Sequence, residues 1–294
     1  MKEKRMEQIT IKASDGLLLA VAVFDVENAK AAVQIIHGLK EHKERYFPLI
    51  RFLNDHGYAV IISDNRGHGE SVSDAWPLGY MEGIDGIIAD QILVTEYMKK
   101  RYPNLSFYLF GHSFGSMVAR VYLQENDDQI DKLLLSGTVN YIPIARFGNL
   151  VGNVLSMFSG KRGYNRWMIQ IGDNGENDWV VKNPEALRAY REDPLCTGYK
   201  YMNRAIMTIW EADAELKRFA KYECKNPTLP VFSISGAEDP VTGGTKGLAD
   251  TIQTLKKIGY QNVESKVYDG MKHEVINEEG KERVYQDILG FFEK

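Results

Sequence analysis

A serine flanked by glycines stands where a predicted strand meets a predicted helix. Residues 111–116 read Gly-His-Ser-Phe-Gly-Ser; they follow the apolar run 106–110 and overlap the start of the helical pattern 116–125. Ser113 therefore lies at a sharp strand-to-helix turn, the geometry of a nucleophile elbow. The glycines two residues to either side relieve crowding at such a turn, because they carry no Cβ. The pattern predicts an exposed hydroxyl placed for nucleophilic attack.

A serine hydroxyl becomes an effective nucleophile only when a base takes its proton, and that base needs an acidic group to orient it. The attack also needs donors for the negative charge that develops on the substrate oxygen. Phe114 follows Ser113 and opens the predicted helix, so its backbone N–H points to where an oxyanion would form. The helix dipole favours negative charge at the same place.

Two loops offer the acid and the base. Asp239 follows a predicted strand through a short turn, which puts its carboxylate at the carboxyl edge of the sheet. Glu238 is the alternative acid, because only one of these adjacent side chains can point at an imidazole. His273 lies between the last predicted strand and the last predicted helix. The chain order Ser113, Asp239, His273 is the order expected for a serine nucleophile on such a sheet.

A second oxyanion donor is expected after the third predicted strand. His37, Gly38 and Leu39 follow that strand directly. Gly38 lets the chain turn closely, so the backbone N–H of Leu39 can face the developing charge. This assignment concerns the backbone and not the His37 imidazole.

The other histidines favour structural roles. His112 lies inside the elbow and is expected to point away from the nucleophile, and His56 ends a predicted helix beside Gly57. His42 and His68 have no carboxylate or cysteine partners at metal-ligand spacing. We therefore expect no metal site.

The elements that must position these residues alternate between strand and helix. A hairpin around Asp15-Gly16 joins strands 8–13 and 17–24, and the alternation follows. This order predicts a mostly parallel sheet with helices on both faces. The further predicted strands are 31–37, 58–63, 106–110, 132–136, 230–235 and 263–268, and the predicted helices are 46–56, 83–101, 116–125, 244–258 and 278–292.

Residues 139–226 interrupt the alternation, and we interpret them as a helical cap inserted between two core parts, 1–138 and 227–294. The insertion is rich in tryptophan and methionine, a set that suits either plain core or an apolar ligand surface. Because the candidate catalytic residues lie outside it, we expect the insertion to govern which ligand binds and not the reaction itself. The residues in question are Trp167, Trp179, Trp210, Met157, Met168, Met202 and Met207.

Composition excludes several classes of protein. The 294 residues are 44% hydrophobic, enough for a substantial core, and carry a net charge of −4 without a basic stripe for nucleic acid. The two cysteines, Cys196 and Cys224, cannot form a disulfide framework and suit reduced thiols in a cytoplasm. No apolar run reaches the roughly 20 residues that span a bilayer, and the apolar run 17–24 lacks the cleavage site of a signal peptide.

Five motifs in this order resemble the monoacylglycerol lipase and lysophospholipase branch of the α/β-hydrolases. The likeness covers nearly the whole core, whereas the cap resembles the family only at Asp193-Pro194-Leu195-Cys196. The motifs are His37-Gly38-Leu39-Lys40-Glu41-His42 with Arg45-Tyr46, Asp64-Asn65-Arg66-Gly67-His68-Gly69-Glu70-Ser71, Gly111-His112-Ser113-Phe114-Gly115, Gly236-Ala237-Glu238-Asp239-Pro240 and His273-Glu274.

The resemblance implies a serine hydrolase that cleaves carboxylic esters through an acyl-enzyme. Ser113 would be the nucleophile, His273 the base and acid, Asp239 the orienting carboxylate, and the Leu39 and Phe114 N–H groups the oxyanion hole. The implied substrates are medium-chain or long-chain monoesters, such as a monoacylglycerol or a lysophospholipid, with no cofactor. The charge and composition of the chain leave transient membrane-surface contact open. Phe114 departs from the Met or Leu often found there, and its ring is expected to narrow the acyl site.

Three alternatives remain open, and the oligomeric state is undetermined. A small-ester carboxylesterase uses the same core, and so does a proline-releasing aminopeptidase. The peptidase needs acidic cap residues to hold an α-amino group, for which Glu185, Glu192, Glu211 and Asp213 are candidates. A ligand-binding module on a hydrolase fold is the non-enzymatic alternative, but a pure binder has no need of all three catalytic side chains.

Polar residues beside these motifs suggest structural roles. We expect Asp64, Arg66 and His68 to belong to a loop that the hydrogen bonds of Arg66 tie down. Glu41 and Glu274 could touch a substrate hydroxyl, but solvation at the surface is the expected state for such carboxylates.

Overall fold

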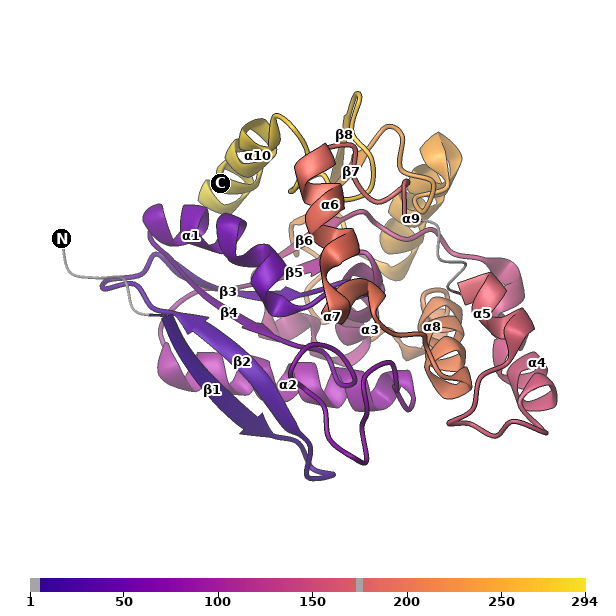
Figure 1. Ribbon diagram of the computed structural model, residues 1–294. Helices are drawn as coiled ribbons and strands as arrows, with labels where there is room; N and C mark the ends of the chain where they lie inside the picture. The colour runs from indigo at the N-terminus through magenta and orange to yellow at the C-terminus, as the bar shows by residue number, and fades with distance from the viewer. Residues whose placement is uncertain (1–5, 173–176) are drawn as a thin grey trace.

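The chain folds around one eight-stranded sheet, and this computed structural model describes residues 6–172 and 177–294 (Figure 1). The strand order is β1-β2-β4-β3-β5-β6-β7-β8, with β1–β2 and β2–β4 antiparallel and all later pairs parallel. The strands are β1 (Met6–Lys12), β2 (Leu18–Phe24), β3 (Ala31–Ile36), β4 (Tyr58–Ser63), β5 (Phe107–His112), β6 (Lys132–Ser136), β7 (Val231–Gly236) and β8 (Val263–Tyr268).

Helices cover both faces of this sheet. The central strands are mostly apolar and are buried along their whole length, as expected for strands covered on two sides. In β6, Leu133 and Leu135 join the core under one layer of helices, while Leu134 joins the core under the other. The first layer holds α2 (Ile84–Arg101), α3 (Phe114–Asn126) and α9 (Gly244–Ile258), and the second holds α1 (Phe47–Asp55) and α10 (Lys281–Glu293).

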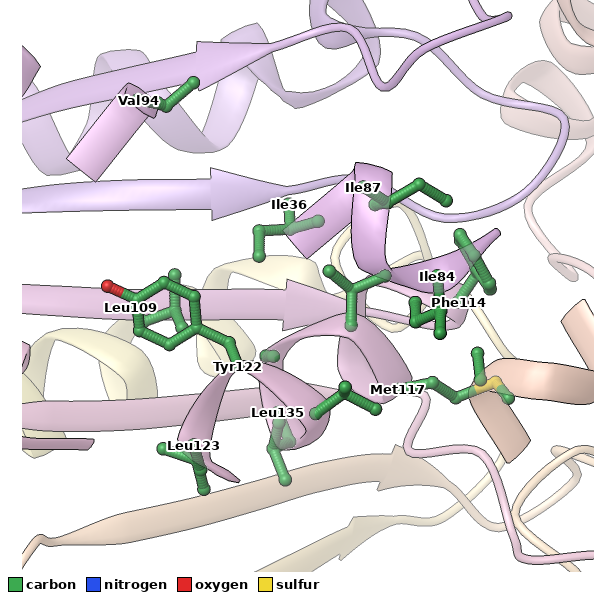
Figure 2. Packing of buried hydrophobic residues seen from close by; sticks show 14 of the residues in the cluster. Ile36, Ile84, Ile87, Val94, Leu109, Phe114, Met117, Tyr122, Leu123 and Leu135 are labelled. Carbon is green, nitrogen blue, oxygen red and sulfur yellow. The ribbon is translucent and has the colours of Figure 1, made fainter. Parts of the chain in front are cut away.

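The larger of the two hydrophobic cores includes residues of the strand and the helix that meet at the elbow. Figure 2 shows Ile87 of α2, Leu109 of β5 and Tyr122 of α3 within this cluster, and all three are fully buried or nearly so. Burying one such side chain contributes about 1.5–3 kcal/mol, so the strand and helix that meet at Ser113 are firmly anchored.

A helical segment separates β6 from β7. Its described residues contain no strand. Helix α8 packs against α3 of the core and against α4, and Figure 1 shows α4 and α5 at the edge of the molecule. Asn183 caps α6 by accepting from two backbone N–H groups, and Asp193 caps α7. The elements are η3 (Pro143–Phe147), α4 (Gly148–Leu155), α5 (Arg166–Gly172), α6 (Pro184–Glu192), α7 (Pro194–Thr197), α8 (Asn203–Glu215) and η4 (Phe219–Lys221).

The predicted mostly parallel sheet with helices on both faces is confirmed, while some element boundaries differ. The strand predicted to end at residue 110 continues to His112, and the next helix begins at Phe114 rather than at residue 116. The last helix begins at Lys281 and not at residue 278, because Gly280 adopts a left-handed φ of 75° and ends the preceding turn. Among the described residues, no helix is long and apolar enough to cross a bilayer.

Candidate active site

The elbow, residues 111–115, has the strained geometry that its glycines predicted. Ser113 has a φ of 53°, in a region that residues with a side chain rarely occupy. A Cβ on Gly111 would lie 2.3 Å from the carbonyl oxygen of Gly115, and one on Gly115 would lie 2.1 Å from that of Ile36. Neither position tolerates a side chain, so the two glycines allow β5 and α3 to meet at Ser113.

The structure brings Asp239, and not Glu238, to the imidazole of His273. The distance from His273 Nδ1 to Asp239 Oδ2 is 2.9 Å, and both side chains are buried. Glu238 points outward and pairs with Lys182 Nζ at 2.7 Å, with both side chains about half exposed. The turn between the two acids therefore sends one carboxylate to the surface and the other to the site.

Burial and charge act in opposite directions on this pair. Burial lowers the pKa of His273, but the carboxylates of Asp239, Glu274 and Glu41 together, Asp239 foremost, outweigh burial and leave that pKa above its ordinary value. Burial raises the pKa of Asp239, and the charge and hydrogen bond of His273 bring it below its ordinary value. Asp239 therefore stays ionised and accepts from Nδ1, which fixes the ring orientation.

The other ring nitrogen of His273 is available for proton transfer. Nε2 is buried and has no hydrogen-bond partner in the part of the chain that the structure describes. Ser113 and His273 line the same cavity. Bonds between a nucleophile and its base are often long without substrate and tighten when substrate binds, so this arrangement is compatible with catalysis.

Gly137, directly after β6, makes room for the His273 ring, and sequence reasoning missed it. A Cβ there would lie 2.7 Å from His273 Cε1 and 3.0 Å from His112 Cε1. The ring centroids of His112 and Trp179 lie 4.8 and 5.0 Å from that of His273. His112, which was expected to have a structural role, packs against the ring of the proposed base. A glycine at the carboxyl end of a strand was the available signal for Gly137.

The two expected oxyanion donors lie beside the nucleophile. Leu39, Phe114 and Ser113 line one cavity, and neither backbone N–H has an acceptor among residues 6–172 and 177–294. Leu39 belongs to the oxyanion loop, residues 37–42, which follows β3. A Cβ on Gly38 would lie 2.9 Å from Ser113 Cβ, so glycine lets this loop approach the nucleophile.

The cavity has a volume of about 300 Å³ and is lined by both apolar and polar residues. Its size lies at the lower end of the range for small-molecule sites. The apolar lining is Leu39, Phe114, Met117, Val139, Trp179, Val180, Ile209 and Val241, and the polar lining is Lys40, Glu41, Ser113, Asn177, Tyr190, Tyr201, His273 and Glu274.

Glu41 and Glu274 are buried, so the expectation that they are solvated is wrong. They are only 4% and 1% exposed. Glu41 accepts from Gly38 N–H at 3.0 Å and from the Tyr46 hydroxyl at 2.6 Å, while Glu274 accepts two bonds from Arg45 at 2.6 and 2.8 Å. The fold brings these partners to the carboxylates and thereby replaces water.

The loop role expected for Arg66 is confirmed. Its guanidinium donates to both oxygens of Asp90 at 2.6 and 2.7 Å and to Asp15 at 2.8 Å.

The expectation that His42 lacks carboxylate and cysteine partners is wrong. The ligand atoms of His42, Asp193 and Cys196 lie within 4.8 Å of one another. His42 Nε2 lies 2.7 Å from a carboxylate oxygen of Asp193, and Nδ1 contacts the carboxylate of Glu44. Sequence reasoning missed Asp193 because it lies 151 residues away from His42.

Most of the tryptophan and methionine set lies away from the cavity. Met168 and Met207 are buried in the main core, whereas Met157 and Trp167 are exposed. Trp179 is the member of this set that lines the cavity, as far as the described residues show. The other apolar side chains of the lining were not in the expected set.

Fold and site together define a class: a mostly parallel sheet with a serine elbow, an Asp–His pair and two backbone donors is an α/β-hydrolase. The family model described as "Serine aminopeptidase, S33" matches residues 27–280, and the chain belongs to that family.

Curated relatives and solved structures agree with this class. The chain is 24% identical to the monoacylglycerol lipase of Mycolicibacterium smegmatis over 92% of this chain and 91% of the relative. It is 23% identical to the phospholipase YtpA of Bacillus subtilis, over 89% and 94% of the two chains. A carboxyl esterase from Bacillus coagulans, solved with glycerol, superimposes with a TM-score of 0.86 at 23% identity and covers 98% of both chains.

Proposed function

We propose that the protein hydrolyses carboxylic esters through an acyl-enzyme. Ser113 is the nucleophile, His273 the base and then the acid, and Asp239 the carboxylate that orients it. The Leu39 and Phe114 N–H groups form the oxyanion hole. The observation that carries this proposal is their convergence on one cavity, with the His273–Asp239 bond at 2.9 Å and with no acceptor for either N–H group among the described residues.

The reaction uses these groups twice. His273 Nε2 takes the proton of Ser113 Oγ as Oγ bonds to the ester carbon, and the two N–H groups stabilise the oxyanion. The proton then passes to the leaving alcohol as the ester C–O bond breaks. A water molecule, deprotonated by His273, attacks the acyl-enzyme in the second half, and the proton returns to Ser113 as the carboxylic acid leaves.

The preferred substrate is a monoester with a medium-length acyl chain, of the monoacylglycerol or lysophospholipid type. The inserted segment, residues 139–226, acts as the cap, because its Trp179 and Ile209 line the same cavity as Phe114 and Met117 of the core. A cavity of about 150 Å³ holds one benzene molecule, so 300 Å³ holds on the order of a dozen heavy atoms. This space suits an acyl chain of about eight carbons.

A chain-length series tests this function. With p-nitrophenyl esters of two to sixteen carbons, we expect kcat/KM to rise by about threefold per methylene up to about eight carbons and then level off. A continuous fall from acetate onward would identify a small-ester carboxylesterase instead. Intact protein that binds these esters without turnover would be a binding module.

The four acidic residues that an aminopeptidase was expected to use for a substrate's α-amino group do not lie at the cavity. Glu211 pairs with Arg204 at 2.6 Å, Asp213 accepts from Ile142 N–H, and both other candidates are exposed. Cleavage of an aminoacyl anilide at a rate matching the octanoate ester would nevertheless restore this alternative.

An exposed apolar surface suits transient contact with an anionic lipid surface. Residues 141–172 include four basic residues and no acidic ones, in a chain of net charge −4. Phe158 is 97% exposed there. We expect binding to phosphatidylglycerol vesicles above phosphatidylcholine vesicles. The exposed apolar side chains of this surface are Ile142, Ile144, Phe147, Leu150, Val151, Val154, Met157, Phe158, Tyr164 and Trp167.

Paired variants test this surface. Replacing Leu150 and Phe158 by serine is expected to lower vesicle binding severalfold, whereas Val267→Ser, at an exposed apolar residue on β8, leaves it unchanged. Equal binding by all three proteins would contradict the lipid proposal. If the wild type forms concentration-dependent dimers and the double variant does not, the surface would instead bind a second copy of this chain.

We propose a cytoplasmic location because the thiols of Cys196 and Cys224 are free.

A further inference from the structure

Three successive backbone N–H groups of the oxyanion loop differ in their hydrogen bonding. Gly38 N–H donates to Glu41 Oε2 at 3.0 Å, and Lys40 N–H donates to the Tyr201 hydroxyl oxygen at 2.8 Å. Leu39 N–H, between them, has no acceptor in the described part of the chain and lies at the cavity. The loop therefore presents one donor to the substrate because the donors on either side are held elsewhere.

The carbonyl side of the same peptide is also fixed. His37 Nδ1–H donates to the carbonyl oxygen of Gly38 at 2.7 Å, and its Nε2 accepts from Asn65 N–H at 2.8 Å. Burial keeps this imidazole neutral by lowering its pKa to about 3. Because a trans peptide is planar, a fixed Gly38 carbonyl directs the Leu39 N–H the opposite way. No cis peptide is present in the described residues.

The direction of the Tyr201 hydrogen bonds follows from His68. His68 Nδ1 lies 3.1 Å from the Arg66 carbonyl oxygen, which can only accept, so Nδ1 carries the proton. Burial lowers the pKa of His68 to about 3, and the ring is neutral, so its Nε2 accepts. The Tyr201 O–H at 2.7 Å must then donate to that nitrogen. Its oxygen is left to accept from Lys40 N–H.

The oxyanion loop also needs help to keep its conformation. Lys40 has a φ of 57°, in the left-handed region that a lysine rarely adopts. Its Nζ donates to the Tyr199 carbonyl oxygen and lies 4.2 and 5.0 Å from the ring centroids of Tyr199 and Tyr201. His42, two residues further on, has its Nε2 at 2.7 Å from a carboxylate oxygen of Asp193. Residues 193–201 of the inserted segment thus hold this loop at several points.

We infer that Tyr201 is a positioning residue for the chemical step. Its hydroxyl connects His68 to Lys40 N–H and thereby keeps Leu39 N–H directed at the oxyanion. This inference rests on the proposed ester hydrolysis. It gives the inserted segment a role besides choosing which ligand binds, because part of this segment holds a donor that every ester substrate needs.

The substitution Tyr201→Phe tests the inference. It removes the bond to Lys40 N–H and keeps the ring, so kcat should fall by about tenfold to a hundredfold, a part of the 10²–10³ that loss of a whole oxyanion donor costs. The factor should be the same for acetate and octanoate esters, with KM within about twofold. Active sites are counted by covalent fluorophosphonate labelling, so that unfolded protein does not lower the measured kcat.

A transition-state analogue gives a second measurement. A trifluoromethyl ketone adds to Ser113 and places an oxyanion in the same position, so Tyr201→Phe should weaken its binding by the factor lost from kcat/KM. A change in KM that grows with acyl length, with inhibitor binding unchanged, would make Tyr201 a wall of the acyl site and overturn the inference. An unchanged kcat would also overturn it.

Tyr260→Phe is the matched control. The Tyr260 hydroxyl is buried and donates to Asp127 at 3.0 Å, outside the cavity. Both variants should lose similar thermal stability, but Tyr260→Phe should keep the wild-type kcat. An equal loss of kcat in both variants would show a general effect of removing a buried hydroxyl and would overturn the inference. A wild-type protein without esterase activity would refute the proposed function, whereas an active wild type with an active Tyr201→Phe refutes only this inference.

Discussion

The elbow and the oxyanion loop lie against each other and line one cavity, but different structures hold their two proposed backbone donors. At the elbow, five consecutive residues at the junction of β5 and α3 set the position of Phe114 N–H, and Gly111 and Gly115 permit the turn. In the loop, Leu39 N–H depends on Tyr201, which lies 161 residues from its partner Lys40. One half of the proposed oxyanion hole is therefore set by neighbouring residues in the sequence, and the other half by contacts between residues far apart in the chain.

This difference predicts how each region responds to change. A local motif keeps its geometry as long as its strand and helix fold, so substitutions there act directly on chemistry or on folding. A loop held by distant partners can lose its alignment while the protein stays folded. Substitutions in the two regions should therefore separate stability from activity.

Ser113→Ala should produce the largest effect. Removing the attacking oxygen should lower kcat by 10⁴-fold or more, because only binding and the oxyanion hole remain. A fluorophosphonate should label the wild type once, at Ser113, and should leave the variant unlabelled, as intact-mass spectrometry would show. Near-full esterase activity in the folded variant would refute the elbow as the site.

Asp239→Asn should cost almost as much, on the order of 10⁴-fold in kcat, because the amide favours the wrong imidazole tautomer; the magnitude is that of the serine-protease aspartate. Glu238→Gln is the matched control, since Glu238 pairs with Lys182 at the surface, and should change kcat less than about twofold. Steady-state kinetics on one ester decide between them. The reverse ranking would reassign the acid.

Replacing one glycine in each region by alanine compares the elbow with the oxyanion loop directly. Gly115→Ala places a Cβ 2.1 Å from a backbone oxygen of β3 and should lower the free energy of unfolding by about 1–3 kcal/mol or more. Gly38→Ala meets Ser113 Cβ at 2.9 Å and should shift the oxyanion loop slightly, with about a tenfold loss of kcat and little loss of stability. Urea unfolding and kinetics on both variants measure the contrast, and equal stability losses would contradict it.

The pH profile should show the smallest effect. His273 must be neutral to accept the Ser113 proton, and the nearby carboxylates, Asp239 foremost, raise its pKa above 6.5 against the effect of burial. The acid limb of kcat/KM should therefore have its midpoint above pH 6.5. The stability that this raised pKa contributes is present at low pH and is lost as pH rises through the folded-state pKa. A midpoint below 6.5 would contradict the assigned base.

Much of the scaffold could be predicted from the sequence because its signals are local. Strand and helix periodicity gave the predicted parallel sheet, and strands 58–63, 132–136 and 263–268 have the predicted bounds. The glycines around Ser113 indicated the elbow, since crowding at a tight turn involves only near neighbours. Residues before and after the turns at Asp239 and His273 likewise indicated the loops that carry them.

Only the tertiary structure shows which residues far apart in the chain come into contact. Glu41 and Glu274 look like surface carboxylates in the sequence, yet the fold buries them against Tyr46 and Arg45. Trp179, in a turn between α5 and α6, lines the cavity, while Trp167 on α5 is exposed. The sequence pattern of the inserted segment does not fix how that segment packs on the core. The hydrogen bond from Lys40 to Tyr201 joins residues far apart in the chain, and no local pattern specifies such a pair.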